Sequence, residues 1–214
     1  MNSVEFGCNN FDNGAVAAIA ETLRRDESLQ HLAIWGNSVG DSGAASLADL
    51  VASCPLVSLV LSNNEMSDNG LSSLAQALPA CPSLRTLDLS VNAHIADTGV
   101  QSLCRALRSE GGPRVEVLTL NNCSVGNEGA RHLATLLTEP ECPLRELDLA
   151  FNMIEDPGAK VLASALEVNS VLVELNVSVN LFSRTGISLL MQALARKHVP
   201  GRQILIEDVP YAGR

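Results

Sequence analysis

Residues Leu144 to Leu166 read LRELDLAFNMIEDPGAKVLASAL, and within them the spacing of apolar residues changes from every second residue to every third or fourth. In the first part, Leu147 and Leu149 alternate with polar residues, which predicts a short strand with one buried face. From Gly158 onward the apolar residues recur at helical spacing, which predicts a helix with one stripe against that strand. The stretch therefore predicts one strand followed by one helix that packs on it.

This unit recurs along nearly the whole chain. Six segments share its frame of apolar residues: LQHLAIWGN, LVSLVLSNN, LRTLDLSVN, VEVLTLNNC, LRELDLAFN and LVELNVSVN. The ninth position of each segment is a marker residue, and successive markers lie 27 to 31 residues apart: Asn9, Asn37, Asn64, Asn92, Cys123, Asn152 and Asn180. A period of this length is the signature of solenoid proteins, so we expect seven stacked repeats, numbered 1 to 7 by these markers.

Each of the first six markers is followed by an acidic or amide residue, a spacer and a glycine, as in Asp156-Pro157-Gly158. Asp and Asn side chains accept hydrogen bonds from the amides that a first helical turn leaves unpaired, and proline is tolerated in that turn. We therefore predict that each acid or amide caps its own helix. Repeat 7 has Arg184 at this position, so we expect a weaker cap there.

One strand and one helix of this size cannot bury their apolar faces alone, so neighbouring repeats must complete the core. Each strand then joins the previous one in parallel through its helix. Strands stack about 4.8 Å apart while helices need about 8 to 10 Å, so the stack curves with its sheet on the inside. The predicted fold class is α/β: a right-handed α/β horseshoe with a parallel inner sheet, outer helices, seven repeats and a terminal strand.

The repeats resemble the leucine-rich repeat family, and specifically its ribonuclease-inhibitor-like subclass. The resemblance rests on L-x-x-L-x-L-x-x-N/C followed by D-x-G-A-x-x-L-A-x-A-L, which repeats 2 to 6 match closely. It implies a single domain over residues 1–214, with a degraded first repeat over 1–28 and a capping strand and tail over 199–214. The first strand starts almost at Met1, so we expect either a longer parent protein or a partner at its exposed edge.

The formal net charge of the chain is -10. Nucleic acid and anionic membrane need clustered Lys and Arg, so we predict neither as a partner and expect a protein or peptide with a basic surface instead. No apolar run approaches the roughly 18 residues of a membrane span, and the amino terminus lacks a signal-peptide pattern. We therefore expect a cytoplasmic protein, and the sequence leaves its oligomeric state open.

The sequence offers no motif for catalysis or metal binding. It contains no HExxH, no Gly-rich phosphate loop after a strand and no GxSxG elbow, so we predict a protein that is not an enzyme and has no catalytic residue. Its six cysteines form no CxxC pair, which predicts buried free thiols and neither metal nor cofactor. The marker asparagines are predicted to pair with backbone groups at the bend after each strand.

Side chains at the third, fifth and seventh positions of each segment are predicted to point into the concave face, away from the helices. These positions carry five carboxylates and no Lys or Arg. Glu146, Asp148 and Glu174 come from adjacent strands and are predicted to form a cluster, with Asp88 two strands away. Unpaired like charges are a reason to expect a ligand, although solvated carboxylates that keep an exposed sheet soluble are the alternative.

Three further residues complete the predicted protein-binding set. Trp35 is predicted to be exposed on the concave face near the amino end, with His31 on the same strand, and Phe151 at the rim near the carboxylates. Exposed aromatic residues are enriched in binding hot spots. The alternative is that Trp35 and Phe151 pack over neighbouring side chains.

The resemblance implies a scaffold for protein recognition, as in ribonuclease inhibitor, the sensor domains of NOD-like receptors and the capping domain of tropomodulin. Our first hypothesis is a non-enzymatic interaction scaffold that binds a basic protein or peptide on its acidic concave face. The second is a structural component of a cytoskeletal or ciliary assembly that docks by its helical face or ends. The third is a GTPase-activating protein that resembles the Ran GTPase activator, a likeness of scaffold alone.

Overall fold

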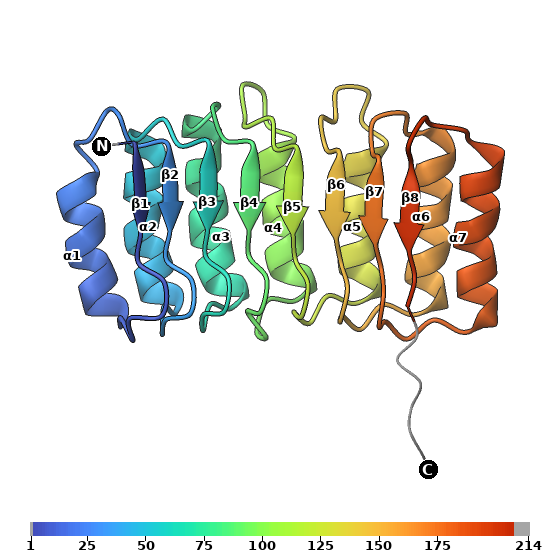
Figure 1. Cartoon of the computed structure of the whole chain (residues 1–214), viewed down its shortest axis with the longest axis horizontal. Coiled ribbons are helices and arrows are strands. Elements are labelled where there is room, and N and C mark those ends of the chain that lie inside the picture. Colours follow the sequence, from blue (N-terminus) through green and yellow to red (C-terminus); the bar gives the residue numbers. More distant parts are fainter. Residues whose placement is uncertain (1, 208–214) are drawn as a thin grey trace, which may run out of the picture.

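The computed structural model describes residues 2–207. They form one eight-stranded parallel sheet, and seven α-helices cover one face of it (Figure 1). The strands follow one another in chain order: β1 (Ser3–Glu5), β2 (His31–Ala33), β3 (Ser58–Val60), β4 (Thr86–Asp88), β5 (Val117–Thr119), β6 (Glu146–Asp148), β7 (Glu174–Asn176) and β8 (Gln203–Leu205). The helices are α1 (Asn13–Leu23), α2 (Asp41–Ser53), α3 (Asp68–Ala77), α4 (Asp97–Leu107), α5 (Asn127–Leu137), α6 (Asp156–Val168) and α7 (Arg184–Arg196). A 3-10 turn, Leu78–Ala80, follows α3.

The core is a stack of leucine layers between the sheet and the helices. One leucine from the centre of each strand β2 to β7 is at most 1% exposed: Leu32, Leu59, Leu87, Leu118, Leu147 and Leu175. Burying such a side chain contributes about 1.5 to 3 kcal/mol. The change from strand to helix within Leu144–Leu166 and the α/β solenoid are therefore confirmed.

The strand positions that face away from the helices are less exposed than the sequence predicted. Third and fifth positions are open or half-buried, as at Glu146 and Asp148. Three seventh positions are buried instead: Ser90, Ala150 and Ser178. The backbone turns next to these buried positions, with a positive φ at Val91, Phe151 and Val179, so the free surface is narrower than the alternation alone suggests.

The marker asparagines form a ladder of buried hydrogen bonds between repeats. The Asn92 side-chain oxygen accepts from the Met66 backbone nitrogen at 3.1 Å, and its amide donates to the carbonyls of Leu61 and Leu89 at 3.0 and 2.9 Å. The same pattern recurs at Asn64, Asn152 and Asn180. The predicted pairing with backbone groups at the bend is confirmed, and it satisfies polar groups that would otherwise be buried without partners.

Repeat 5 replaces the asparagine by Cys123, whose thiol lies 3.6 Å from the Leu89 carbonyl. The repeat before it has one extra residue within Ala93-His94, and this lets the Ile95 amide turn back onto the Asn92 carbonyl at 2.9 Å. In other repeats the equivalent amide donates to the side-chain oxygen of the next marker asparagine. Cysteine has no such oxygen, and here the Asn92 carbonyl takes its place as the acceptor.

The acids at the helix starts cap the helix of the following repeat, which corrects our prediction. Asp41 is the first residue of α2, and it accepts hydrogen bonds from the backbone nitrogens of Ser67 and Gly70, at 2.8 and 2.9 Å, at the start of α3. Five other residues reach across to the next repeat in this way: Asn13, Asp68, Asp97, Asn127 and Asp156. Asp12, in repeat 1, does cap its own helix by accepting from the Ala15 amide at 2.8 Å.

This contact explains both the glycine of the motif and the exception in repeat 7. A Cβ atom on Gly70 would lie 2.6 Å from the Asp41 carboxylate oxygen, so only glycine allows that approach. Arg184 has no further helix to cap within the described residues, because only β8 follows α7. The α7 helix itself is capped by Ser183 and by Asp156 of repeat 6, so our expectation of a weaker cap there is wrong.

The cysteines are all free, and five of the six are buried. Cys8 is the exception to our prediction, because it is exposed on the bend after β1. Burial raises the pKa of Cys104 to about 12 and that of Cys123 to about 11. Thiols in this state are poor nucleophiles, since the thiolate is the reactive form.

A terminal strand forms at the expected place, because β8 pairs with β7 in parallel. Arg202 fastens it: its guanidinium donates to the carbonyls of Leu166, Asn169 and Leu172 at 2.7 to 3.0 Å. The first two of these carbonyls lie at the carboxyl end of α6, where the helix dipole favours a cation. Residues 208–214 of the expected cap lie outside the described residues, so its capping role stays a prediction.

Candidate protein-binding face

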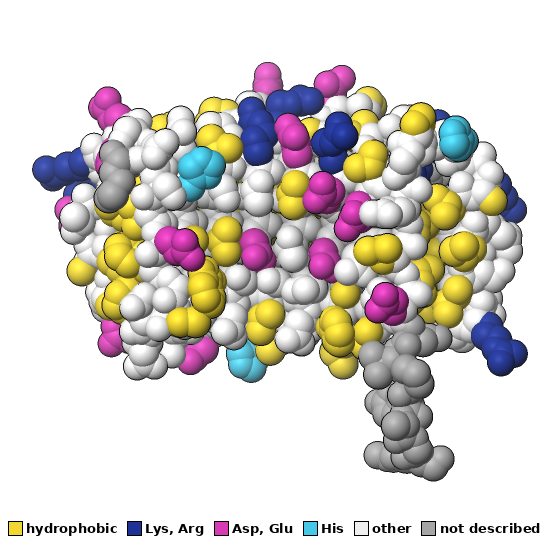
Figure 2. Space-filling view, in the orientation of Figure 1, with side chains coloured by type: hydrophobic (Ala, Val, Ile, Leu, Met, Phe, Trp, Pro, Cys, Tyr) yellow, Lys and Arg dark blue, Asp and Glu magenta, His cyan; other side chains and the backbone are white. Residues whose placement is uncertain are grey.

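The strand face of the sheet carries carboxylates along its middle (Figure 2). We term four of them the carboxylate band: Asp88, Glu146, Asp148 and Glu174. The register places Glu146 beside Glu174, whereas Thr119 of β5 stands between Asp148 and Asp88. Adjacent strands lie about 4.8 Å apart, so three of these acids are immediate neighbours and Asp88 is about 10 Å away.

Asp148 is the most constrained member of the band. Burial raises its pKa above the ordinary value, and the charges of Glu174 and Asp88 raise it further. Hydrogen bonds from the Ala150 backbone, at 2.9 Å, and from the Asn176 side chain act in the opposite direction without cancelling this effect. The ionised form of Asp148 is thus destabilised on this face, and a nearby cation would relieve it.

The other three acids differ in how firmly they are held. Asp88 accepts from the Ser90 backbone and hydroxyl at 2.9 and 2.6 Å, and Glu174 accepts from the Gln203 amide at 2.6 Å. The side chain of Glu146 is exposed and has no hydrogen bond or ion pair within residues 2–207. It is therefore the carboxylate most available to a partner.

An apolar rim borders the band where β6 and β7 end. It consists of Phe151, Met153 and Leu181, which are 51%, 56% and 57% exposed. Phe151 was predicted from the sequence, whereas Met153 and Leu181 were not. A signal was present, because this repeat position is Met153 and Leu181 in repeats 6 and 7 but polar or small earlier: Asn10, Ser38, Glu65, Ala93 and Ser124.

Trp35 and His31 lie apart from the band, at the amino-terminal end of the sheet. His31 is exposed on β2, and Trp35, which follows this strand, is 36% exposed. The Trp35 indole donates to the Glu5 carboxylate at 3.1 Å and covers Gly7, where a Cβ atom would lie 2.2 Å from the ring. The predicted site residues therefore form two separate groups, and part of Trp35 packs over the neighbouring repeat.

Arginines border the strand face along the edge where the strands begin (Figure 2). Arg85 and Arg145 occupy the second position of their segments, and Arg85 lies 3.8 Å from the Glu116 carboxylate. Neither arginine belongs to the predicted site, because the second position is not one of the inward-facing positions. The face is thus acidic in the middle with cations on one edge.

The described part of the chain offers neither a metal cluster nor a membrane-spanning helix. Among residues 2–207, no group of three or more His, Cys, Asp or Glu is arranged to hold a metal ion. None of the described helices is both long enough and apolar enough to cross a bilayer. What this face offers chemically is recognition through charge and apolar contact.

Known proteins share these repeats. The family described as Leucine Rich repeat matches residues 26–48, 52–75, 80–104 and 142–163. Ribonuclease inhibitor from Sus scrofa is 36% identical over 151 residues, which cover 70% of this chain and 32% of the inhibitor. Human NACHT, LRR and PYD domains-containing protein 5 is 32% identical over 196 residues, covering 91% of this chain and 14% of that protein.

A solved structure shares the fold as well. The crystal structure of an internalin from Listeria monocytogenes superposes with a TM-score of 0.59 at 18% identity, covering 100% of this chain and 48% of the internalin. At this identity the likeness shows the fold alone.

The repeat geometry and these matches define an α/β solenoid of the leucine-rich repeat class. More narrowly, the chain belongs to the ribonuclease-inhibitor-like subclass of leucine-rich repeat proteins, as the sequence predicted. It spans about a third of the length of the porcine inhibitor and a smaller share of the human relative. Membership supports a protein-interaction scaffold in general terms.

Proposed function

We propose that this chain is a non-enzymatic interaction scaffold that binds a basic protein segment on its strand face. The observation that supports the proposal is the carboxylate band, because the parallel register gathers these acids on a surface whose inward positions carry no Lys or Arg. A cationic ligand would be attracted by the summed charge and would stabilise the ionised form of Asp148.

The apolar rim supplies the second part of the interaction. Phe151, Met153 and Leu181 expose large apolar surfaces beside the acids of the same two repeats. Interfaces draw most of their affinity from a few apolar or aromatic anchors that exclude water, while charges set orientation and association rate. The proposed partner segment therefore carries Lys or Arg together with at least one apolar side chain.

The edge arginines limit which partners fit. Arg85 and Arg145 would repel a broad basic surface but not a narrow basic segment that follows the band. Repulsive elements of this kind contribute to specificity.

Two relatives are named ribonuclease inhibitor, so a ribonuclease is one folded protein to test.

A reducing compartment such as the cytoplasm suits the proposed scaffold, because all six cysteines are free. The non-enzymatic assignment is supported by relatives that are binding or scaffold proteins.

The test uses a fluorescent ten-residue peptide of lysines with two leucines, and its affinity is measured by anisotropy. The first variant reverses the carboxylate band: Asp88→Lys, Glu146→Lys, Asp148→Lys and Glu174→Lys. The matched control makes the same change in net charge at four exposed acids outside the strands: Glu27→Lys, Asp49→Lys, Glu65→Lys and Glu141→Lys. Circular dichroism checks that both variants are folded.

We expect the band variant to lose about 100-fold or more in affinity and the control to stay within about threefold, because close charge pairs dominate over distant ones in salt. Met153→Ser with Leu181→Ser should weaken binding about tenfold, which tests the apolar rim. Equal losses in the band variant and the control would refute the proposed face, since the interaction would then depend on net charge alone.

A further inference from the structure

The helical side of the molecule holds one groove whose charged lining residues are mainly cations. A groove of about 520 Å³ between α4 and α5 is lined by Arg105, Arg108, Arg131 and His132. We term these four residues the arginine groove. The chain has 14 Lys and Arg against 24 Asp and Glu, so three arginines along one groove form a local exception to its net charge.

The repeat framework does not require these arginines. The position that Arg105 occupies in α4 is filled in the other helices by Glu21, Asp49, Gln76, Thr135, Ser164 and Gln192. In a solenoid, positions that support stacking recur from repeat to repeat. Arg105 is therefore not needed for stacking, and it shares its groove with other cations.

The cations of the groove are only loosely neutralised. Arg108 pairs with Glu139 at 2.5 Å and Arg131 with Glu128 at 2.6 Å, and all four side chains are well exposed. Exposed ion pairs contribute little stability and can exchange partners. Arg105 makes no ion pair within residues 2–207.

His132 reports on the potential of the groove. Burial lowers its pKa, and the charge of Arg131 lowers it further. Glu128 and Asp97 act in the opposite direction without cancelling this effect, and Arg105 adds the smallest lowering contribution. An anion in the groove would raise the pKa of His132 toward its ordinary value.

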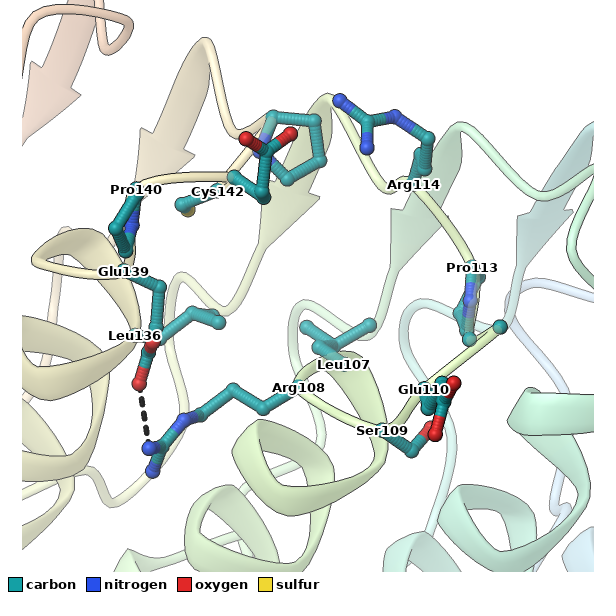
Figure 3. A pocket seen from close by; sticks show the side chains of 14 residues that line it. Leu107, Arg108, Ser109, Glu110, Pro113, Arg114, Leu136, Glu139, Pro140 and Cys142 are labelled. Atoms are coloured by element: carbon teal, nitrogen blue, oxygen red, sulfur yellow. Dashed lines mark ion pairs between the residues drawn. The ribbon is translucent and has the colours of Figure 1, made fainter.

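A second pocket of about 460 Å³ adjoins the groove and shares Arg108 and Glu139 with it. It lies between the loops that follow α4 and α5, and Figure 3 shows the Arg108–Glu139 ion pair on one side of it. We term it the loop pocket. Its apolar lining comes from Leu107, Pro113 and Leu136, together with Pro140 and Pro143. Glu110, Glu139 and Glu141 also line it, so it suits an apolar side chain and not a carboxylate.

We propose that the arginine groove and the loop pocket together bind an acidic protein segment that carries one large apolar side chain. Its carboxylates would contact Arg105 and Arg131, because a guanidinium can bind a carboxylate through two parallel hydrogen bonds. Its apolar side chain would enter the loop pocket, which is large enough for a leucine or phenylalanine. This goes beyond the proposed function of the strand face, because it assigns a second, acidic partner to the helical side of the molecule.

A nucleic acid fits these features less well. A long polyanion would meet the net charge of -10 along most of the surface, whereas a short acidic segment need only enter the groove. A phosphate backbone also offers nothing apolar to the loop pocket.

The test compares three labelled ten-residue peptides by anisotropy at about 0.15 M salt, where long-range steering is screened. One is rich in glutamate with a single leucine, the second has serine in place of the leucine, and the third has glutamine in place of the glutamates. We expect the first to bind tightest, with losses of at least about fivefold for the second and tenfold for the third.

Variants of the protein then locate the site. Arg105→Glu with Arg131→Glu should weaken the first peptide at least about tenfold, because it reverses two of the three arginines. Arg25→Glu with Arg184→Glu is the matched control, because it makes the same change in net charge. Both arginines are exposed away from the groove and make no ion pair among the described residues, so affinity should change less than about twofold. Binding should also raise the pKa of His132 followed by NMR in the wild type.

The proposal is overturned if the glutamate-leucine peptide does not bind, or if it binds the arginine variant and the wild type equally. Equal affinity for the leucine and serine peptides would remove the loop pocket from the site. Equal, variant-sensitive binding of a single-stranded oligonucleotide of matched charge would overturn the assignment to an acidic protein segment.

Discussion

Replacing Asp41 by alanine tests whether the acids at the helix starts join neighbouring repeats. The Asp41 carboxylate accepts from the backbone nitrogens of Ser67 and Gly70 at 2.8 and 2.9 Å, and from the Ser67 hydroxyl at 2.7 Å. Asp41→Ala leaves the first turn of α3 with unpaired, partly buried amides. A hydrogen bond to a charged group is worth about 1.5 to 3 kcal/mol, and losses within one network are not fully additive. We expect a loss of about 3 kcal/mol, which corresponds to a decrease in Tm of about 6 to 12 °C at this chain length.

Urea unfolding followed by far-UV circular dichroism measures the loss, and hydrogen exchange at the amides of α3 locates it. Repeat stacks can lose cooperativity when one interface weakens, so the midpoint and the slope of the transition are both compared. Asp41→Asn keeps one acceptor oxygen and should cost about 1 kcal/mol.

The pH dependence gives a second check on the same contact. Burial acts to raise the pKa of Asp41, but hydrogen bonds from Ser67 and Gly70 outweigh it and hold the pKa below its ordinary value. A lowered pKa means that the carboxylate stabilises the fold above its unfolded pKa and that this contribution is lost as pH falls through the folded one. The difference between wild type and Asp41→Ala should therefore shrink below about pH 4.

Arg184→Ala is the control, because it changes the equivalent residue of repeat 7, where no further described helix needs a cap. It should change the free energy of unfolding by less than about 0.5 kcal/mol. If Asp41→Ala costs no more than Arg184→Ala, or if exchange increases in α2 rather than α3, then the capping between repeats is not what stabilises the stack.

Four further predictions follow from individual residues. Glu174→Gln should lower the pKa of Asp148 in an NMR titration, because it removes one of the charges that raise it, and an unchanged pKa would contradict the proximity of the two. In the native protein Cys8 alone should react rapidly with a thiol reagent such as DTNB, with the other five reacting only after unfolding. Val91→Asn should stabilise the protein by about 1 kcal/mol in urea unfolding, since Val91 is a β-branched residue held at φ 56°, and a loss of stability would show that this backbone is not strained. Arg202→Met should cost about 2 kcal/mol and increase hydrogen exchange in β8, because it removes the guanidinium that ties this strand to α6, and unchanged exchange would contradict that role.

Most of the candidate strand face could be read from the residues. Inward positions follow directly from the alternation of a strand, so Glu146, Asp148 and Glu174 were found as neighbours. Met153 and Leu181 were missed because they lie after the strand, on a bend. The alternation within a strand does not predict which way side chains on that bend point. The separation of Trp35 from the carboxylates follows from strand order, but its contact with Glu5 and its packing over Gly7 required the side-chain arrangement.

The repeat, its strand and helix, and the asparagine ladder all follow from the amino-acid sequence, because each depends on a period that neighbouring residues share. Which groups meet across repeats depends on how the repeats stack in three dimensions. Asp41 lies at the start of one helix yet caps the next, and Arg105 and Arg131 line one groove although they stand on different helices. Contacts of this kind join residues that lie nearly one repeat apart in the chain. The packing of the leucine layers sets how far one repeat is shifted relative to the next, and the spacing of residues within one repeat carries no information about that shift.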